Sequence, residues 1–342
     1  MSEPADREPG ELLEAVRRDA LIRPGRPVVV MLSGGRDSTC LLDVAVAIAG
    51  TPAVTALHVN YGLRDAAAGD ERHCAQLCER LEVELTVRHP GAPTLGNLQA
   101  WARDARYGAA AQLASGRGGA DVAAGHTATD QVETILYRLA SSPSRRALLG
   151  MRAREGSLIR PLLQFTRADT AAYCRARGLQ WREDETNESD LYARGRVRTG
   201  LVPALREIHP GAERNVLALA EILRDEAAVL DGVVDDVLRG KVEIPVSALR
   251  ELPRGLSRLI VQRLADGAAG RPAPGTARRL DEILALRETA ALDLPHGVRA
   301  VVTDGVLSFT RSPSPGHRRT VDQPPSPSPG GQRSIDHPPK SN

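Results

Sequence analysis

Residues 27–42 read PVVVMLSGGRDSTCLL, and this stretch decides the fold of the first half of the chain. Its first six residues form a continuous apolar run, which predicts a strand buried on both faces. A Ser- and Gly-rich loop follows from Ser33 to Ser38, and apolar residues then recur at helical spacing from Leu41 to Ile48. A strand that passes through such a loop into a helix directs backbone N–H groups at one point, which favours phosphate binding.

The loop is not a Walker loop, because GxxxxGK occurs nowhere in the chain, and the GRGG segment at 116–119 lacks the third glycine of GxGxxG. It resembles the SGGxDS pyrophosphate loop of N-type ATP pyrophosphatases, which split ATP into AMP and pyrophosphate. The alternative is an ordinary strand–helix turn that uses Ser, Gly and Asp for their turn chemistry. The resemblance implies that the whole hexapeptide binds ATP: Ser33, Gly34, Gly35, Arg36, Asp37 and Ser38.

Composition sets broader limits. A length of 342 residues suggests about two domains, and a net charge of +2 does not by itself indicate nucleic acid binding. Lysine occurs only at Lys241 and Lys340 among the 45 basic residues. The four cysteines form no CxxC pair, so they are expected to pack in the interior. No signal peptide and no apolar run of about 18 residues occurs, and we expect a soluble cytoplasmic protein with no membrane partner.

Strand and helix patterns alternate as far as residue 177. This alternation predicts βαβ units and an α/β fold with a doubly wound, mostly parallel sheet, in which ligands bind at the carboxyl ends of the strands. After the first strand and its helix, strands are expected at 53–59, 82–87, 121–124 and 157–163, and helices at 65–81, 97–115, 130–140 and 166–177. Thr166 and Asp169 give the last of these helices a capping-box start.

Past Pro210 the alternation stops. Helices are expected at 215–239, 254–266 and 276–286, and short strands at 291–294, 299–303 and 306–310, the last two joined by an Asp304-Gly305 turn. We therefore expect an ATP pyrophosphatase domain at 1–210 and a second, mostly helical domain with short strands at 211–311. Residues 312–342 are rich in Pro, Ser and Gly with few apolar residues, which predicts a disordered tail.

Four further stretches bear on the reaction. They are HVNYGLR at 58–64, WARDARY at 101–107, GHTATDQVET at 125–134, and EDETN at 183–187 leading to RGRVR at 194–198. With these motifs the chain resembles the bacterial tRNA(Ile)-lysidine synthetases, which show HVxHGLR, ARxxRY, GHxxDDQxET, RPLL, EDxTN and RNxIR in this order. The resemblance covers about residues 27–210, and it implies that the mostly helical domain at 211–311 binds tRNA.

The resemblance implies a reaction in two steps. ATP adenylates the 2-carbonyl of the wobble cytidine in a tRNA(Ile) with a CAU anticodon, and the ε-amine of free lysine then displaces AMP to give lysidine. It also implies roles for residues outside the loop. These are ATP binding by His58, Arg64, Gly125 and His126, lysine binding by Asp130 and Glu133, catalysis by Asp37, Glu133 and Arg198, and a phosphate or substrate clamp by Arg106 and Arg198.

The chemistry itself asks for similar groups. Pyrophosphate leaves with its charge neutralised, which calls for Mg²⁺, and Asp37 is the natural ligand, although an Asp also suits a helix start without any metal. Lysine needs one negative charge to hold its α-ammonium and another group to accept its ε proton. Asp130 and Glu133 lie three apart and suit these tasks, although they also suit a helix-capping pair.

Arginines are harder to interpret in so Arg-rich a chain. Arg106 and Arg198 match phosphate or carboxylate bidentately, yet a single Arg is more often a solvated side chain. The stretch 138–160 holds six arginines and one acid, Glu155, and is either tRNA-binding surface or a solvated loop. Thr129 replaces the first Asp of DDQ in the family pattern, and Gly195 replaces the Asn of RNxIR. Tyr61 in place of the second His of HVxHGLR is a milder departure.

Three other functions remain open from the sequence. A tRNA-thiolating enzyme with the same loop would need paired cysteines, which are missing. An ammonia-using amidating enzyme fits the loop but gives no reason for the second domain. A nucleotide-binding module without catalysis is the third alternative, suggested by Thr129 and Gly195.

Overall fold

The apolar run that ends in SGGRDS forms β1 (Val28–Met31), an inner strand of a six-stranded sheet with the order β3-β2-β1-β4-β6-β5. Every residue of β1 is buried, as a strand covered on both faces requires. The first five strands of that order are parallel, and β5 pairs antiparallel with β6. Their bounds are β2 (Val54–Val59), β3 (Glu84–Arg88), β4 (Asp121–Ala123), β5 (Arg154–Glu155) and β6 (Leu158–Ile159).

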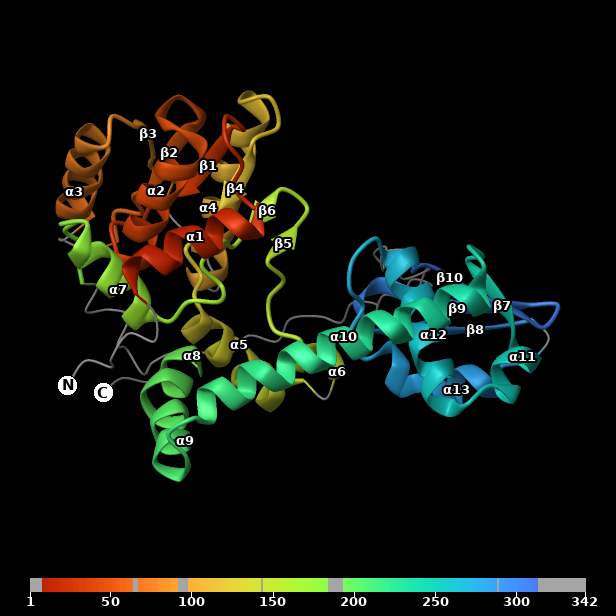
Figure 1. Cartoon of the computed structure of the whole chain (residues 1–342). Coiled ribbons are helices and arrows are strands. Elements are labelled where there is room, and N and C mark those ends of the chain that lie inside the picture. Colours follow the sequence, from red (N-terminus) through yellow and green to blue (C-terminus); the bar gives the residue numbers. More distant parts are fainter. Residues whose placement is uncertain are drawn as a thin grey trace, which may run out of the picture. The chain divides into compact units, whose positions relative to one another are not determined.

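The computed structural model describes residues 8–63, 67–91, 98–142, 144–183, 193–287 and 289–312. It divides into two compact units, with the division between Asp231 and Gly232 (Figure 1). No helix of the described ranges is both long and apolar enough to cross a bilayer.

The strand order places the phosphate loop. From β1 the chain winds outward through β2 and β3, and it then returns to pair β4 with the other side of β1. The carboxyl ends of β1 and β4 therefore flank the point where the winding direction reverses, which is where ligands bind in open α/β sheets. The loop after β1 and the GHTATD segment after β4 meet there.

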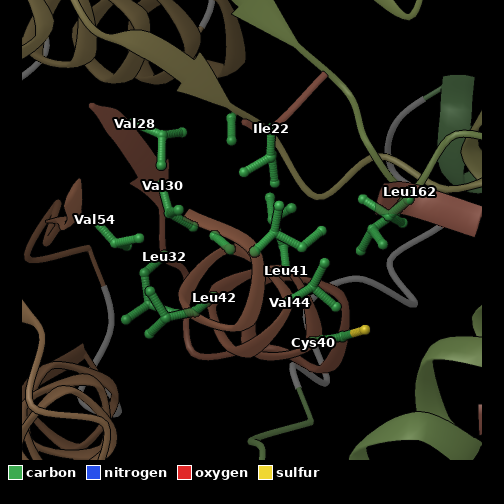
Figure 2. Packing of buried hydrophobic residues seen from close by; sticks show 14 of the residues in the cluster. Ile22, Val28, Val30, Leu32, Cys40, Leu41, Leu42, Val44, Val54 and Leu162 are labelled. Atoms are coloured by element: carbon green, nitrogen blue, oxygen red, sulfur yellow. The ribbon is translucent and has the colours of Figure 1, made fainter. Parts of the chain in front are cut away.

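Helices cover both faces of this sheet. On one face, Val28 and Val30 pack with Leu41 and Leu42 of α2 (Figure 2). On the other face, Val29 and Met31 pack with alanines of α4. The helices of the first face are α1 (Pro9–Asp19), α2 (Arg36–Ala49), α3 (Ala67–Arg80) and α7 (Arg167–Ala176), and α4 spans Leu98–Gly116.

The expected fold class is confirmed, with one wrong element. The strand predicted at 157–163 is only two residues long, because the chain turns after Arg160. The turn buries Leu162 and Phe165 completely in the core beneath α2, which an extended strand would not do. The short strand β5 was not predicted. The capping box at Thr166 and Asp169 is confirmed, with the Thr166 side chain accepting from the Asp169 N–H at 3.2 Å.

Residues 193–208 form helical segments that the sequence analysis did not predict. They run as α8 (Ala193–Arg196), a π-helical segment (Val197–Leu201) and α9 (Val202–Ile208). Val197 and Val202 pack with α5 (Ala128–Ser141), which is followed by the short α6 (Arg145–Leu148). This packing brings Arg198 to the first turns of α5.

The long helix predicted at 215–239 is α10 (Ala212–Leu238), and the division between the two units lies inside it. The second unit packs helices against an antiparallel sheet with the order β7-β10-β9-β8. Asp304 and Gly305 join β9 to β10 with positive φ values of 50° and 76°, which confirms the predicted hairpin. The remaining α-helices and the strands of the second unit are β7 (Glu243–Pro245), α11 (Val246–Glu251), α12 (Arg254–Ala269), α13 (Leu280–Ala285), β8 (Ala290–Leu294), β9 (Val298–Thr303) and β10 (Val306–Arg311).

The strand β7 and helix α11 were not predicted, because neither is long enough to show a periodic pattern. The domain boundary at 210 stays a prediction. The tail predicted from 312 onward lies, beyond its first residue, outside the described residues.

Removal of a core side chain beneath the phosphate loop tests the packing. Leu41 is fully buried, and we expect Leu41→Ala to lower the free energy of unfolding by about 3 kcal/mol because it leaves a cavity. Urea denaturation of the full chain, followed by circular dichroism, measures this. Leu139→Ala is the control, since Leu139 is 57% exposed, and a change there of about 0.5 kcal/mol or less is expected. Equal effects would contradict the packing described.

Candidate functional site

The SGGRDS loop closes on itself through its two serines. The Ser33 and Ser38 hydroxyls lie 3.0 Å apart, and the Ser38 hydroxyl donates to the Gly35 carbonyl at 2.9 Å. Gly34 has φ of +84°, which side chains rarely adopt. Gly35 is the N-cap of α2 and has no side chain with which to cap it. The first amides of α2 therefore face the carboxyl edge of the sheet without a capping side chain from Gly35, as an anion site requires.

The segment after β4 lies against this helix start. A Cβ added to Gly125 would lie 3.1 Å from the carbonyl carbon and oxygen of Asp37 and 3.1 Å from the Ser38 nitrogen. These are backbone atoms of the first turn of α2, so they cannot give way as a flexible side chain would. Glycine at this position lets the β4 end approach the loop closely.

The start of α5 is capped differently from expectation. Thr127 is the N-cap: its N–H donates to Asp130 Oδ2 at 2.8 Å, and its hydroxyl accepts from the Asp130 N–H at 3.4 Å. The alternative in which Asp130 and Glu133 form a capping pair is therefore wrong, because Asp130 is paired with Thr127. Glu133 lies one turn further along and is left for other contacts.

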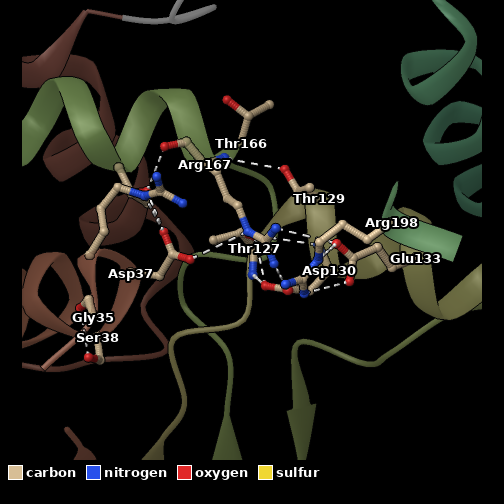
Figure 3. Close-up of polar contacts among 12 residues, drawn as sticks. Gly35, Asp37, Ser38, Thr127, Thr129, Asp130, Glu133, Thr166, Arg167 and Arg198 are labelled. Carbon is tan, nitrogen blue, oxygen red and sulfur yellow. Dashed lines mark hydrogen bonds and ion pairs between the residues drawn. The ribbon is translucent and has the colours of Figure 1, made fainter. Parts of the chain in front are cut away.

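Glu133 binds Arg198. Arg198 Nε lies 2.7 Å from Glu133 Oε1, and its terminal NH2 nitrogen lies 3.0 Å from Glu133 Oε2 (Figure 3). The hydrogen bond to Glu133 raises the pKa of Arg198. Arg198 comes from the π-helical segment, a geometry often found at functional sites. Arg198 thus makes two hydrogen bonds to Glu133, although Gly195 stands where the family pattern has Asn.

A residue that the sequence analysis missed completes the cluster. Arg167, the first residue of α7, places its guanidinium 2.8 Å from Asp130 Oδ1, 3.4 Å from Glu133 Oε1 and 3.8 Å from Asp37 Oδ2 (Figure 3). The capping box at Thr166 marked it as a helix start, which was the only available signal. Nothing in an Arg-rich sequence distinguishes this arginine from its neighbours.

Asp37 faces the same cluster from α2. It accepts from the Thr170 hydroxyl at 2.5 Å and from Arg36 Nε at 3.2 Å. Burial raises the pKa of Asp37 above its usual value, against the opposing effects of Arg36 and Thr170. Thr170 is fully buried in α7, so the packing of α7 on α2 fixes this contact, which the sequence analysis did not predict.

Comparison with known proteins gives the family. Residues 5–205 match the model of the PP-loop domain. Proteins named tRNA(Ile)-lysidine synthase from Geobacter sulfurreducens, Thermus thermophilus and Symbiobacterium thermophilum are 32%, 34% and 34% identical to the chain. The matches cover 85%, 87% and 87% of this chain and 66%, 60% and 68% of those proteins. The chain belongs to the tRNA(Ile)-lysidine synthase family. It thus spans 60% to 68% of the length of these three relatives.

A solved structure supports the fold of this lysidine synthase family member. The U34-tRNA thiolase NcsA from Methanococcus maripaludis, solved with its iron–sulfur cluster, aligns with a TM-score of 0.52 and 18% identity. The alignment covers 63% of this chain and 78% of the thiolase. At this identity the likeness concerns the fold.

Two site acids of this family member differ in their electrostatic surroundings. Burial pushes the pKa of Asp130 upward, but the charge of Arg167 and the donors of Thr127 outweigh it, so the pKa lies below the usual value. The pKa of Asp37 is shifted in the other direction, and the negative charge of Asp130 contributes to that rise. Environments that separate the pKa values of neighbouring acids are typical of sites with distinct roles for each.

His126, predicted to bind ATP, lies where β4 ends and is largely buried. Burial lowers the pKa of His126 to about 4, and the positive charges of Arg160, Arg106 and Arg103 contribute in the same direction. The imidazole is therefore uncharged at neutral pH. Its Nδ1 and the Nε of Arg106 are buried and have no hydrogen-bond partner within the described residues. Such atoms are free to bind a ligand oxygen.

His58 and Arg64 were also predicted to bind ATP. His58 is buried behind the loop, with Nδ1 2.9 Å from the Leu32 carbonyl oxygen and 3.4 Å from the Cys74 sulfur. It braces β2 against the end of β1, and a role in ATP binding stays a prediction. Arg64 lies outside the described residues. Of the EDETN motif only Glu183 is described, next to Arg182, whose N–H donates to the Gly34 carbonyl at 3.0 Å.

The acidic side chains of the site suit a magnesium ion whose other ligands are phosphate oxygens and water. No group of three or more His, Cys, Asp and Glu side chains suited to a metal occurs among the described residues. Mg²⁺ usually takes one or two carboxylates and completes its shell with phosphate oxygens and water. Asp37 beside the phosphate loop, with Asp130 near it, fits that pattern.

The close approach at Gly125 is testable. We expect Gly125→Ala to push the first turn of α2 away and to weaken ATP binding at least tenfold, because the added carbon meets backbone atoms. Gly116→Ala is the matched control, since an added Cβ there meets nothing within 4 Å. Calorimetric titration with ATP and Mg²⁺ measures both. An unchanged affinity in Gly125→Ala would contradict a tight contact.

The buried His126 predicts a pH dependence of stability. Its folded pKa of about 4 lies below the unfolded value near 6.5, so the unfolded chain binds the extra proton between these values. Stability from this group is therefore complete above pH 6.5 and is lost as pH falls toward 4. We expect His126→Asn to flatten the fall in the free energy of unfolding between pH 6.5 and 4. If the free energy of unfolding falls equally in variant and wild type between pH 6.5 and 4, His126 is not held uncharged in the folded protein.

Proposed function

We propose that the protein ligates lysine to the wobble cytidine of a tRNA(Ile) with a CAU anticodon, using ATP, and releases AMP and pyrophosphate. The name of its relatives supports this assignment. The structural observation that carries it is the meeting of a phosphate loop with a cluster of three acids, Asp37, Asp130 and Glu133, at the reversal of strand order. The tRNA substrate supports the cytoplasmic location expected from the sequence.

The loop amides bind the outer phosphates of ATP in this proposal. A cytosine carbonyl oxygen is a poor leaving group, so it first attacks the α-phosphate and pyrophosphate departs. Magnesium, when bound, neutralises the charge of the departing pyrophosphate, and Asp37 would hold it. In this proposal His126 and Arg106 donate to phosphate oxygens. The buried Nδ1 of His126 and Nε of Arg106, which have no hydrogen-bond partner within the described residues, support this role.

Lysine must then attack with a neutral ε-amine. At pH 7 the deprotonation of an amine with a pKa of 10.4 costs about 4.6 kcal/mol, and a carboxylate that grips the ammonium raises this cost. We assign Asp130 to the α-ammonium, because its lowered pKa keeps it charged.

Glu133 is assigned to the ε-amine. In the substrate-free protein both of its carboxylate oxygens accept hydrogen bonds from Arg198. Arg198 therefore turns to a substrate phosphate or carboxylate, which it matches bidentately, and this frees Glu133 to accept the proton.

The tRNA-binding surface proposed at 138–160 is narrower than the sequence suggested. Arg138 donates to the Gly150 carbonyl at 2.7 Å, Arg154 pairs with Asp121 at 2.7 Å, and Arg160 donates to the Arg152 carbonyl at 2.7 Å. These three support the local fold. Arg146 and Arg152 are exposed, and we assign contact with the tRNA backbone to them.

No structural observation favours thiolation or a passive module. All four cysteines are buried, and burial raises the pKa of Cys74 and of Cys78 to about 12, so these two remain protonated thiols rather than sulfur carriers. A passive module would not need acids with separated pKa values beside the loop. Amidation with ammonia leaves the lysine-binding acids without a role.

The assay follows both half-reactions. The protein is incubated with ATP, Mg²⁺, labelled lysine and unmodified tRNA(Ile), and AMP and labelled tRNA are counted. Lysine at the anticodon supports ligation, AMP without lysine transfer indicates another acceptor, and ATP binding without turnover indicates a passive module.

In that assay two variants separate the steps. We expect Asp37→Ala to abolish AMP formation, because the metal that neutralises pyrophosphate loses its carboxylate ligand, while some ATP binding survives.

We expect Glu133→Gln to reduce lysine transfer about a hundredfold and adenylation far less, since general base catalysis contributes on that order. Equal loss of both steps in Glu133→Gln would contradict its assignment, and wild-type AMP yield in Asp37→Ala would remove Asp37 from the mechanism.

A further inference from the structure

Arg167 lies among the acids of the site. Each of its three guanidinium nitrogens faces a different carboxylate: NH2 faces Asp130, NH1 faces Glu133 and Nε faces Asp37 (Figure 3). The first of these contacts is a hydrogen bond of 2.8 Å, and the other two are longer. A single side chain therefore provides the positive charge that three acids from two helices share.

Its backbone is fixed and its side chain is not enclosed. The Arg167 N–H donates to the Thr129 hydroxyl at 3.3 Å, and the capping box at Thr166 holds the start of α7. The side chain is 25% exposed, whereas that of Glu133 is 5% exposed. The Arg167 side chain thus reaches solvent while its backbone is anchored at the start of α7.

The charges of the cluster balance without substrate. Asp37, Asp130 and Glu133 face Arg36, Arg167 and Arg198, so three negative charges meet three positive ones. Thr129 adds no charge to this set. A lysine brings two ammonium groups, and these would approach a site whose acids already hold a cation. Like charges repel strongly where water is largely excluded.

We propose that Arg167 occupies the acids in place of the substrate ammonium and leaves them when lysine binds. Arg167 is in this account a positioning residue that sets the affinity for lysine, and the proposal rests on the proposed function. The acids keep other partners when Arg167 leaves: Arg36 pairs with Asp37, Arg198 pairs with Glu133, and the Thr127 N–H donates to Asp130. Lysine binding includes the displacement of the guanidinium, which weakens the apparent affinity in proportion to its occupancy.

The direction in which one substitution changes the KM for lysine tests this proposal. If Arg167 holds the acids about nine times in ten, then Arg167→Gln lowers the KM for lysine about tenfold, because every molecule is then ready to bind. A raised KM would mean that Arg167 contacts lysine or phosphate directly, and an unchanged KM would mean that it is not displaced. Either result overturns the proposal.

Two further variants control the experiment. Arg177→Gln removes another pair between α7 and α2, that of Arg177 Nε with Asp43 Oδ2 at 3.0 Å, and should leave the KM for lysine unchanged. Arg167→Lys keeps the charge but reaches fewer acids with its single ammonium, so its KM should lie between those of Arg167→Gln and wild type. The latter variant decides the question if Arg167→Gln does not fold, as judged by circular dichroism.

A binding measurement separates the two proposals. The full chain is titrated calorimetrically with lysine in the presence of ATP and Mg²⁺, without turnover. Arg167→Gln should bind lysine about tenfold more tightly than wild type, in line with the expected change in KM. Wild-type protein that transfers no lysine would overturn the proposed function. Wild-type protein that transfers lysine, together with equal lysine affinity in both proteins, would overturn only the role of Arg167.

Discussion

The close contact between Gly125 and the first turn of α2 is the constraint on which the site depends. An added Cβ would lie 3.1 Å from three backbone atoms of that turn, so only a residue without a side chain lets the end of β4 lie this close to the phosphate loop. This contact sets the distance between the loop amides and the acids of α5, which begins three residues later. Phosphate-binding and carboxylate groups therefore share one edge of the sheet.

The carboxylates of that edge are held by arginines from three segments of the chain. Arg36 comes from α2, Arg167 from α7 and Arg198 from the π-helical segment, and together they balance Asp37, Asp130 and Glu133. Buried or half-buried acids without such partners would take up protons and lose their charge. The arginines keep the acids ready for a cationic substrate, but they also compete with it, and the site combines both effects.

The sequence anticipated much of this site because its signals are local. A buried strand, a Gly-bearing loop and a helix are encoded within residues 27–42, and the capping box at Thr166 and the hairpin at Asp304-Gly305 need only three or four consecutive residues each. Where an element was too short to show a periodic pattern, the prediction failed. The two-residue β6 was expected to be longer, and the helical turns at 193–208 were missed.

The sequence by itself determined that a phosphate loop follows a buried strand and that Asp130, Glu133 and Arg198 are candidate site residues, because motif spacing carries that information. Only the tertiary structure decided which cation meets which acid. Asp130 caps with Thr127, Glu133 binds Arg198, and Arg167 joins all three acids, since α7 packs on α2 beside the start of α5. Contacts between helices far apart in the chain depend on packing, and spacing along a sequence does not encode them.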